Sequence, residues 1–146
     1  MRATSLLIFG LLTLASCKKD DEQEVGDTPV ITFESISPGS VKAYSDSVVI
    51  RIQYEDGNGD LGENNTTEPN AFITDVRSGL EYQFRVRQLA PDDANIHIRG
   101  SLNIVVPQVA FIGSGSSETA TFKVKIEDRA GNMSNEITTT AITVTP

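Results

Sequence analysis

In Val48-Val49-Ile50-Arg51-Ile52-Gln53-Tyr54-Glu55, the apolar residues at positions 48, 50, 52 and 54 alternate with the polar residues at positions 51, 53 and 55. Successive side chains of a β-strand point to opposite faces, so this period of two predicts a strand with one buried face. The alternation recurs in residues 82–86 and 122–126, where the polar positions hold glutamine, arginine or lysine. The sequence lacks the 3.6-residue period of an amphipathic helix, so these segments predict an all-β chain.

Four further segments complete the set of expected strands. Residues 102–106 alternate before Pro107, and weaker patterns cover residues 30–36, 72–76 and 137–144. Turn-forming residues separate the segments, at positions 37–39, 56–59, 78–79, 91–93, 113–115 and 130–132. About seven short strands separated by such turns predict a single antiparallel β-sandwich of immunoglobulin-like type over residues 29–146.

The amino terminus has the three parts of a bacterial export signal in order. Arg2 gives a basic start, residues 6–14 are apolar, and Leu14-Ala15-Ser16-Cys17 follows. At ~1.5 Å per residue, a helix over the apolar run would cross only about half of a ~30 Å hydrocarbon core. We therefore expect residues 1–16 to be a cleaved signal peptide rather than a membrane span.

Leu14-Ala15-Ser16-Cys17 resembles the lipobox of bacterial lipoproteins, in which the cysteine becomes the lipidated first residue of the mature chain. The resemblance implies a covalent lipid on Cys17 and attachment to a membrane, because each buried CH₂ of an acyl chain contributes ~0.8 kcal/mol. The alternative is an ordinary signal peptide that happens to contain a cysteine. Cys17 is the only cysteine of the chain, so an internal disulfide is excluded.

Residues 17–28 form the expected link to the domain, a lipidated cysteine followed by a flexible acidic tether. Lys18-Lys19-Asp20-Asp21-Glu22 resembles the signal that carries lipoproteins of the Bacteroidota across the outer membrane. That resemblance implies display on the cell surface, and a tether on the periplasmic face of the outer membrane is the alternative. Without residues 1–16, eleven basic and twenty acidic residues leave a net charge of −9, which disfavours nucleic acid as a partner and suits divalent cations.

Asp56, Asn58 and Asp60 stand at alternate positions with glycines between them, so their side-chain oxygens can converge. Calcium binds six to eight such oxygens. If residues 48–54 and 122–126 are the second and sixth strands of the sandwich, the loops that follow them emerge at the same end. We therefore expect Asp128 and Asn132 to join a calcium site with the first three residues.

The predicted calcium site does not follow the helix-loop-helix template. Leu61 stands where that template has an invariant glycine, and Thr67 stands where it has a bidentate glutamate. Glu55 or Glu127 is expected to complete the shell of ligands. The alternative is that the Asp-Gly and Asn-Gly pairs serve only as turn dipeptides, because both are favoured where φ is positive.

Two segments resemble known families of domains. Residues 125–135 resemble the penultimate strand and following turn of bacterial immunoglobulin-like and fibronectin-type-III-like domains. Residues 54–62 are similar to a segment common in uncharacterised lipoproteins of the same bacterial group. The resemblances cover about twenty residues, and such families mostly carry no assigned activity.

The chain offers little for catalysis. His97 is the only histidine, which excludes a multi-histidine metal site and leaves histidine-based catalysis unsupported. We expect a membrane-anchored, non-enzymatic binding or adhesion module that contacts an envelope protein or an extracellular polymer through its loops. The alternative is a structural accessory subunit of an outer-membrane complex, such as a polysaccharide-uptake system.

Overall fold

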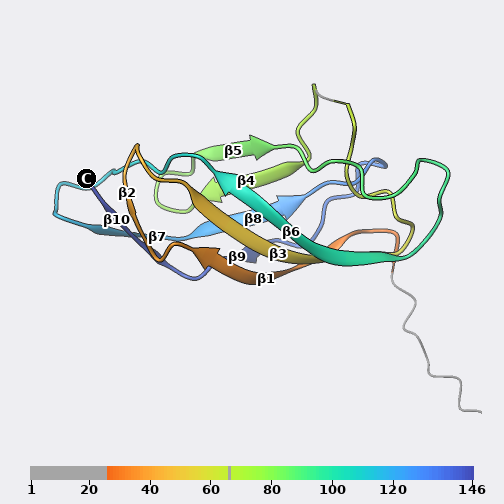
Figure 1. The fold of residues 1–146 in the computed structure, drawn as a ribbon, viewed down its shortest axis with the longest axis horizontal. Coiled ribbons are helices and arrows are strands. Elements are labelled where there is room, and N and C mark those ends of the chain that lie inside the picture. The colour runs from red at the N-terminus through yellow and green to blue at the C-terminus, as the bar shows by residue number, and fades with distance from the viewer. Residues whose placement is uncertain (1–25, 66) are drawn as a thin grey trace, which may run out of the picture.

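The computed structural model describes residues 26–65 and 67–146 (Figure 1). The predicted signal peptide, Cys17 and most of the predicted tether lie outside the described residues. In the described part there is no helix, and hence none that could cross a membrane. The strands are β1 (Val30–Ser37), β2 (Ser40–Lys42), β3 (Val48–Asp56), β4 (Ala71–Asp75), β5 (Glu81–Phe84), β6 (Ile98–Val106), β7 (Glu118–Ala120), β8 (Phe122–Ile126), β9 (Ile137–Thr138) and β10 (Ile142–Thr145).

The strands pack as a two-layered sandwich (Figure 1). One layer is the antiparallel sheet β1-β3-β6, and the other begins with β5-β4-β8-β9. The sheet β2-β10-β7 continues this second layer, because only Thr121 separates β7 from β8 and only residues 139–141 separate β9 from β10. When these two interruptions are bridged, the ten segments make eight strands, close to the predicted number of about seven. The predicted all-β sandwich is therefore confirmed.

The structure differs from the prediction in the pairing of β2 with β10, which is parallel. After β1, the chain passes Pro38 and Gly39 and crosses to the other layer, where β2 runs in the same direction as β10. Proline has no N–H to donate to a ladder, so the pairing of β1 ends before it. The sandwich is therefore mixed rather than fully antiparallel.

Two predicted strands are shorter or interrupted. The strand expected over residues 82–86 ends at Phe84, because Val86 pairs instead with the side chain of Asn70, through Val86 N–H to Oδ1 (2.7 Å) and Nδ2–H to the carbonyl (3.1 Å). The strand expected over residues 137–144 breaks at Thr139, whose Oγ1 accepts a hydrogen bond from Phe122 N (3.0 Å) in place of a backbone oxygen.

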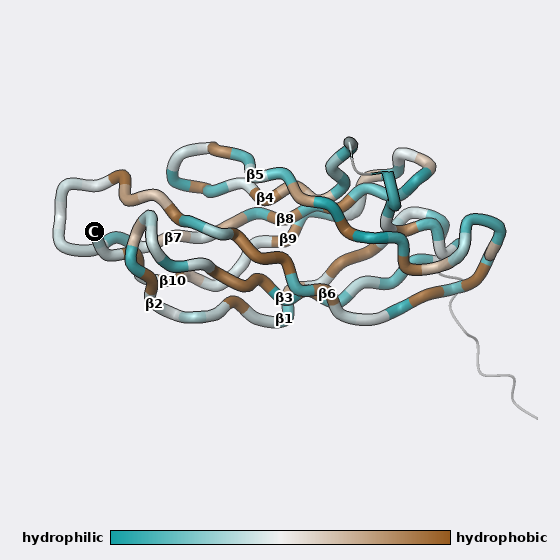
Figure 2. The backbone as a smooth tube through the Cα atoms, turned by 45° about the horizontal axis from the view of Figure 1, so that its top comes forward, coloured by the Kyte–Doolittle hydropathy of each residue, from teal (hydrophilic) through white to brown (hydrophobic). Residues whose placement is uncertain are grey.

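The core lies between the inner faces of the two layers. On β3, Val48, Ile50 and Ile52 are fully buried, and on β8 the alternate residues Phe122 and Val124 are fully buried as well. Figure 2 shows hydrophobic and hydrophilic positions interleaved along the strands of the sandwich. Each fully buried side chain of this size contributes roughly 1.5–3 kcal/mol. The period of two in the sequence therefore identifies the inner faces correctly.

A buried ion-pair cluster closes the end of the sandwich that carries the β4–β5 turn. Arg77 follows β4 and binds the carboxylate of Asp75, which is 1% exposed, and that of Glu118 on β7 (2.6 Å). Its Nη2 also donates to the carbonyl of Ala110 (3.1 Å). Since Asp75 pairs with Phe122 at the start of β8, this cluster lies at the opposite end of β8 from the loop that begins at Glu127.

Candidate metal centre

The loop after β3 folds back on the last residue of the strand. Asp56 is fully buried, and its Oδ2 accepts a hydrogen bond from the backbone N–H of Leu61 (2.9 Å). Leu61 is also fully buried and holds the loop in the core. Gly59 has a φ of 76°, which a side chain would strain, and Asn58 Oδ1 accepts from Asp60 N (3.2 Å). The loop therefore curls so that Asp56, Asn58 and Asp60 lie on one short turn.

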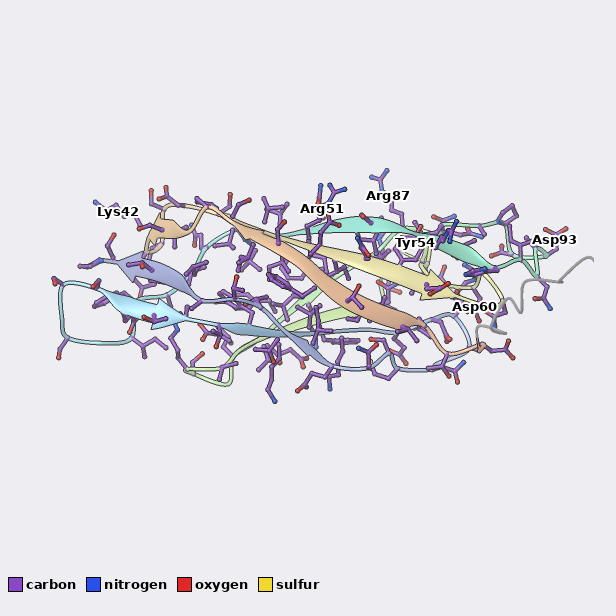
Figure 3. The ribbon with its side chains drawn as sticks, turned by 90° about the horizontal axis from the view of Figure 1, so that it is seen from below. Lys42, Arg51, Tyr54, Asp60, Arg87 and Asp93 are labelled. Carbon is purple, nitrogen blue, oxygen red and sulfur yellow. The ribbon has the colours of Figure 1, made fainter. Side chains whose placement is uncertain are left out.

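The loop after β8 packs directly against this turn. Leu61 and Asp128 form an antiparallel bridge, and Arg129 N donates to the carbonyl of Asp60 (3.1 Å). Figure 3 shows Asp60 at the end of the sandwich that carries Asp93, opposite the end that carries Lys42. The expectation that the two loops meet at one end of the sandwich is confirmed.

Two carboxylate oxygens in this cluster have no partner. Asp56 Oδ1 and Asp60 Oδ1 are buried and accept no hydrogen bond from the described residues. Burial raises the pKa of Asp56, the N–H of Leu61 opposes that rise, and the nearby carboxylate of Asp128 adds to it. Burial, Asp128 and Asp56 likewise raise the pKa of Asp60. Negative charge is thus concentrated in a place where the backbone N–H groups of residues 58, 60 and 61 offset the effect of burial on Asp56 only in part.

Arg129 is the basic residue next to the cluster, but it is used elsewhere. Its Nη1 donates to the carbonyl of Gly62 (2.8 Å), and its Nε lies 3.6 Å from the exposed carboxylate of Asp92. Its charge lowers the pKa of Asp60. Among the described residues, however, no cation lies within ion-pair distance of Asp56, Asp60 or Asp128. Arg129 therefore balances part of the charge without filling the free oxygen positions.

Asp128 and Asn132 lie beside the loop after β3, as expected, but they are hydrogen-bonded to each other. Asp128 Oδ1 accepts from Asn132 N (2.7 Å), and its Oδ2 accepts from Asn132 Nδ2 (2.9 Å). Over residues 26–65 and 67–146, no three histidine, cysteine or carboxylate side chains are arranged to hold a metal ion by themselves. A calcium ion would therefore need a mixed set of donors, including Asn58 and backbone carbonyls, and the ligand roles of Asp128 and Asn132 stay predictions.

The two expected additional ligands lie in different places. Glu55 pairs with His97 (2.9 Å) and is directed away from the cluster by its strand position next to Asp56. Glu127 lines a cavity of about 290 Å³ together with Glu63, Glu68 and Asp128. This acidic cavity adjoins the cluster through Asp128, so Glu127 is the better placed of the two.

Comparison with protein-family models, curated proteins and solved structures finds no match to this chain. The assignment of the site therefore rests on its geometry.

Three features of this site were not anticipated from the sequence. The Leu61 N–H that binds Asp56, the Arg129 guanidinium and the acidic cavity around Glu63 all depend on how the loops cross in space. Leu61 stands out in the sequence only as an apolar residue within a polar loop, which is a signal for a buried anchor.

The raised pKa values predict a pH effect in the absence of metal. Between the ordinary value of 3.8 and the raised folded value, the folded chain keeps protons that the unfolded chain has released. The contribution of Asp56 and Asp60 to stability should therefore fall as the pH rises through this window. Urea unfolding in chelator, at pH values from about 4 to 7, should show a steeper loss in the native domain than in Asp56→Asn/Asp60→Asn. Parallel curves would contradict the assignment.

Proposed function

We propose that the loops 56–62 and 127–132 bind one calcium ion, with Asp56 and Asp60 as its charged ligands. The observation that carries the proposal is the pair of buried oxygens, Asp56 Oδ1 and Asp60 Oδ1, that have no partner in the described structure. A buried acceptor without a donor costs about 1–3 kcal/mol, and carboxylate oxygens are ligands that calcium prefers. A cation at this position would remove that cost.

The charge of the cluster supports a divalent ion. Three carboxylates, those of Asp56, Asp60 and Asp128, face one guanidinium from Arg129. Counted as full charges together with Asp92, which pairs with Arg129, the group carries −3, and one calcium ion would neutralise two of these charges. The remaining oxygens would come from Asn58, the loop carbonyls and water, since calcium takes six to eight ligands in flexible geometry.

We propose that the whole chain is a lipid-anchored, non-enzymatic binding module of the outer membrane, with Cys17 as the lipidated residue and an envelope protein or extracellular polymer as its partner. The position of the proposed calcium loop supports a role near the anchor, because Gly57 N donates to the carbonyl of Gly26 (3.2 Å), which belongs to the predicted tether. Calcium would then stiffen the membrane-facing end of the domain. Protease treatment of intact cells tests surface display, and a protected domain would place it on the periplasmic face.

Isothermal titration of residues 26–146 with calcium chloride tests the binding step. We expect one site with a Kd on the order of 10⁻⁴–10⁻³ M, as in extracellular calcium modules. Asp56→Asn/Asp60→Asn should lose the heat of binding. The matched control is Asp27→Asn/Asp93→Asn, which removes two exposed carboxylates and should bind as the native domain does. An equal loss of the heat of binding in both variants would mean that calcium responds only to the net charge of the domain, and it would overturn the proposed site.

A further inference from the structure

A groove runs along one open side of the sandwich, between the segment 84–89 and strand β6. Its volume is about 350 Å³. It lies there because β5 and β6 are the outermost strands of their sheets, so the two layers are not closed by a shared strand. It is lined by Phe84, Arg85, Val86, Arg87, Leu89 and residues 102–105.

Strand β6 presents a free edge to this groove. All nine residues from Ile98 to Val106 pair with β3, and no backbone hydrogen bond joins β6 to another described segment. In an antiparallel strand, alternate N–H and C=O groups point away from the paired neighbour. Such an edge accepts an added strand through main-chain hydrogen bonds.

The charge of the groove is opposite to that of the chain. The chain has a net charge of −8, whereas the lining of the groove has two arginines and no acidic residue. Arg85 Nη1 donates to the carbonyls of Glu63 and Asn64 (3.2 Å each). Arg85 forms no ion pair with a described residue, although its charge lowers the pKa of Glu63. Arg87 is exposed, forms no ion pair with a described residue, and points away from the body of the domain in Figure 3.

The wall of the groove opposite β6 is held in place. Glu63 N donates to the carbonyl of Val86 (3.0 Å), and Leu89 N donates to the carbonyl of Leu61 (3.2 Å). A Cβ at Gly62 would overlap the carbonyl of Arg87, so the loop and the wall are in close contact. The groove is therefore preformed, which lowers the entropy cost of binding an extended segment.

We propose that this groove docks an extended, acidic segment of a partner protein, which adds to the edge of β6. Alternate side chains of the segment would cover the apolar lining at Phe84, Leu89 and Leu102, and its carboxylates would meet Arg85 and Arg87. The proposal names the surface through which a binding module would act, and it does not depend on calcium. Its failure would therefore leave the calcium site untouched.

Fluorescence anisotropy with a labelled peptide of alternating valine and glutamate tests the proposal on the full chain purified in detergent. About seven residues at ~3.3 Å each span the groove and its flanks. We expect saturable binding with a Kd on the order of 10⁻⁴ M. Replacing glutamate by lysine in the peptide should weaken binding, and methylation of alternate backbone nitrogens should abolish it when the methylated groups face β6.

Arg87→Gln should weaken binding about two- to fivefold, as expected for an exposed charge pair. The matched control Lys125→Gln removes one positive charge from β8 and should leave the affinity unchanged. Amide signals of residues 84–89 and 98–106 should shift on titration with the peptide. No saturable binding at millimolar peptide, equal affinity for the lysine peptide, equal effects of Arg87→Gln and Lys125→Gln, or shifts confined to other strands would each overturn the proposal.

Discussion

Asp56→Asn should raise the unfolding midpoint of the domain in chelator, although Asp56 is fully buried and hydrogen-bonded. The amide keeps an oxygen that can accept from Leu61 N, and it places an NH₂ group where Asp56 Oδ1 has no partner. That group can donate to the neighbouring carboxylates, whose repulsion also decreases. Since an unsatisfied buried acceptor costs about 1–3 kcal/mol, we expect a rise of roughly 4 °C or more.

In calcium, the native domain should have a higher unfolding midpoint than the variants that lack Asp56, which reverses the order expected in chelator. At about 100 times Kd, calcium adds about 2.7 kcal/mol to a domain that binds it at one site, which corresponds to roughly 10 °C here. Asp56→Asn/Asp60→Asn should gain none of this, whereas Asp27→Asn/Asp93→Asn should gain all of it. Differential scanning calorimetry in chelator and in calcium measures both effects. A calcium-dependent rise that persists in the double variant would show that these aspartates are not the ligands.

Arg77→Ala should cause a larger loss of stability than the removal of any other ion pair of the described structure. The side chain of Asp75 is 1% exposed and that of Glu118 is 17% exposed. Both would lose the guanidinium in a largely dry environment and keep only backbone N–H donors. Removing one partner of a buried pair costs about 3–5 kcal/mol, which should lower the unfolding midpoint by more than 10 °C.

Arg51→Ala is the matched control for Arg77→Ala. Arg51 pairs with Glu34 at 2.7 Å, but the two side chains are 44% and 32% exposed. Exposed pairs of this kind contribute about 0.2–1 kcal/mol. Chemical denaturation of both variants measures the difference. Similar losses in the two would mean that the Arg77 cluster does not stabilise the fold as its burial indicates.

The strands that the sequence predicts well are those whose inner faces carry large apolar side chains. β3 and β8 match the alternating segments 48–54 and 122–126 closely, because both strands are half-buried in the core. Strand β6 begins at Ile98, earlier than the expected residue 102. The sequence pattern missed this part of the strand because residues 99–101 are polar or glycine and are exposed. Alternation of apolar and polar residues does not predict the part of a strand that is held only by backbone hydrogen bonds to its neighbour.

Strands β2 and β7 have three residues each and carry too little alternation to be predicted. The parallel partner of β2 is β10, about a hundred residues later in the chain. Sequence periodicity contains no information on such long-range pairing. The break at Thr139 depends on a side-chain oxygen that binds Phe122 N, which is also a tertiary contact.

The candidate calcium site could be predicted from the sequence only to the extent that the strand topology brings its two loops together. The alternate spacing of Asp56, Asn58 and Asp60, together with the shared end of two loops, was enough to place Asp128 nearby. Side-chain orientation was not predictable, since Asn132 donates to both oxygens of Asp128 rather than leaving them free. The two unpartnered oxygens of Asp56 and Asp60 become visible only in three dimensions.

Thermal unfolding of residues 26–146, in about 10 mM calcium and in chelator, tests the calcium proposal most directly. For a Kd of about 10⁻⁴ M, binding to the native state alone predicts a rise of roughly 10 °C in calcium. The same concentration of magnesium should give a much smaller rise, because magnesium requires near-octahedral geometry and holds its water tightly. An unfolding midpoint that is the same in calcium and in chelator would contradict the proposal, and the loop after β3 would then be a turn without a metal.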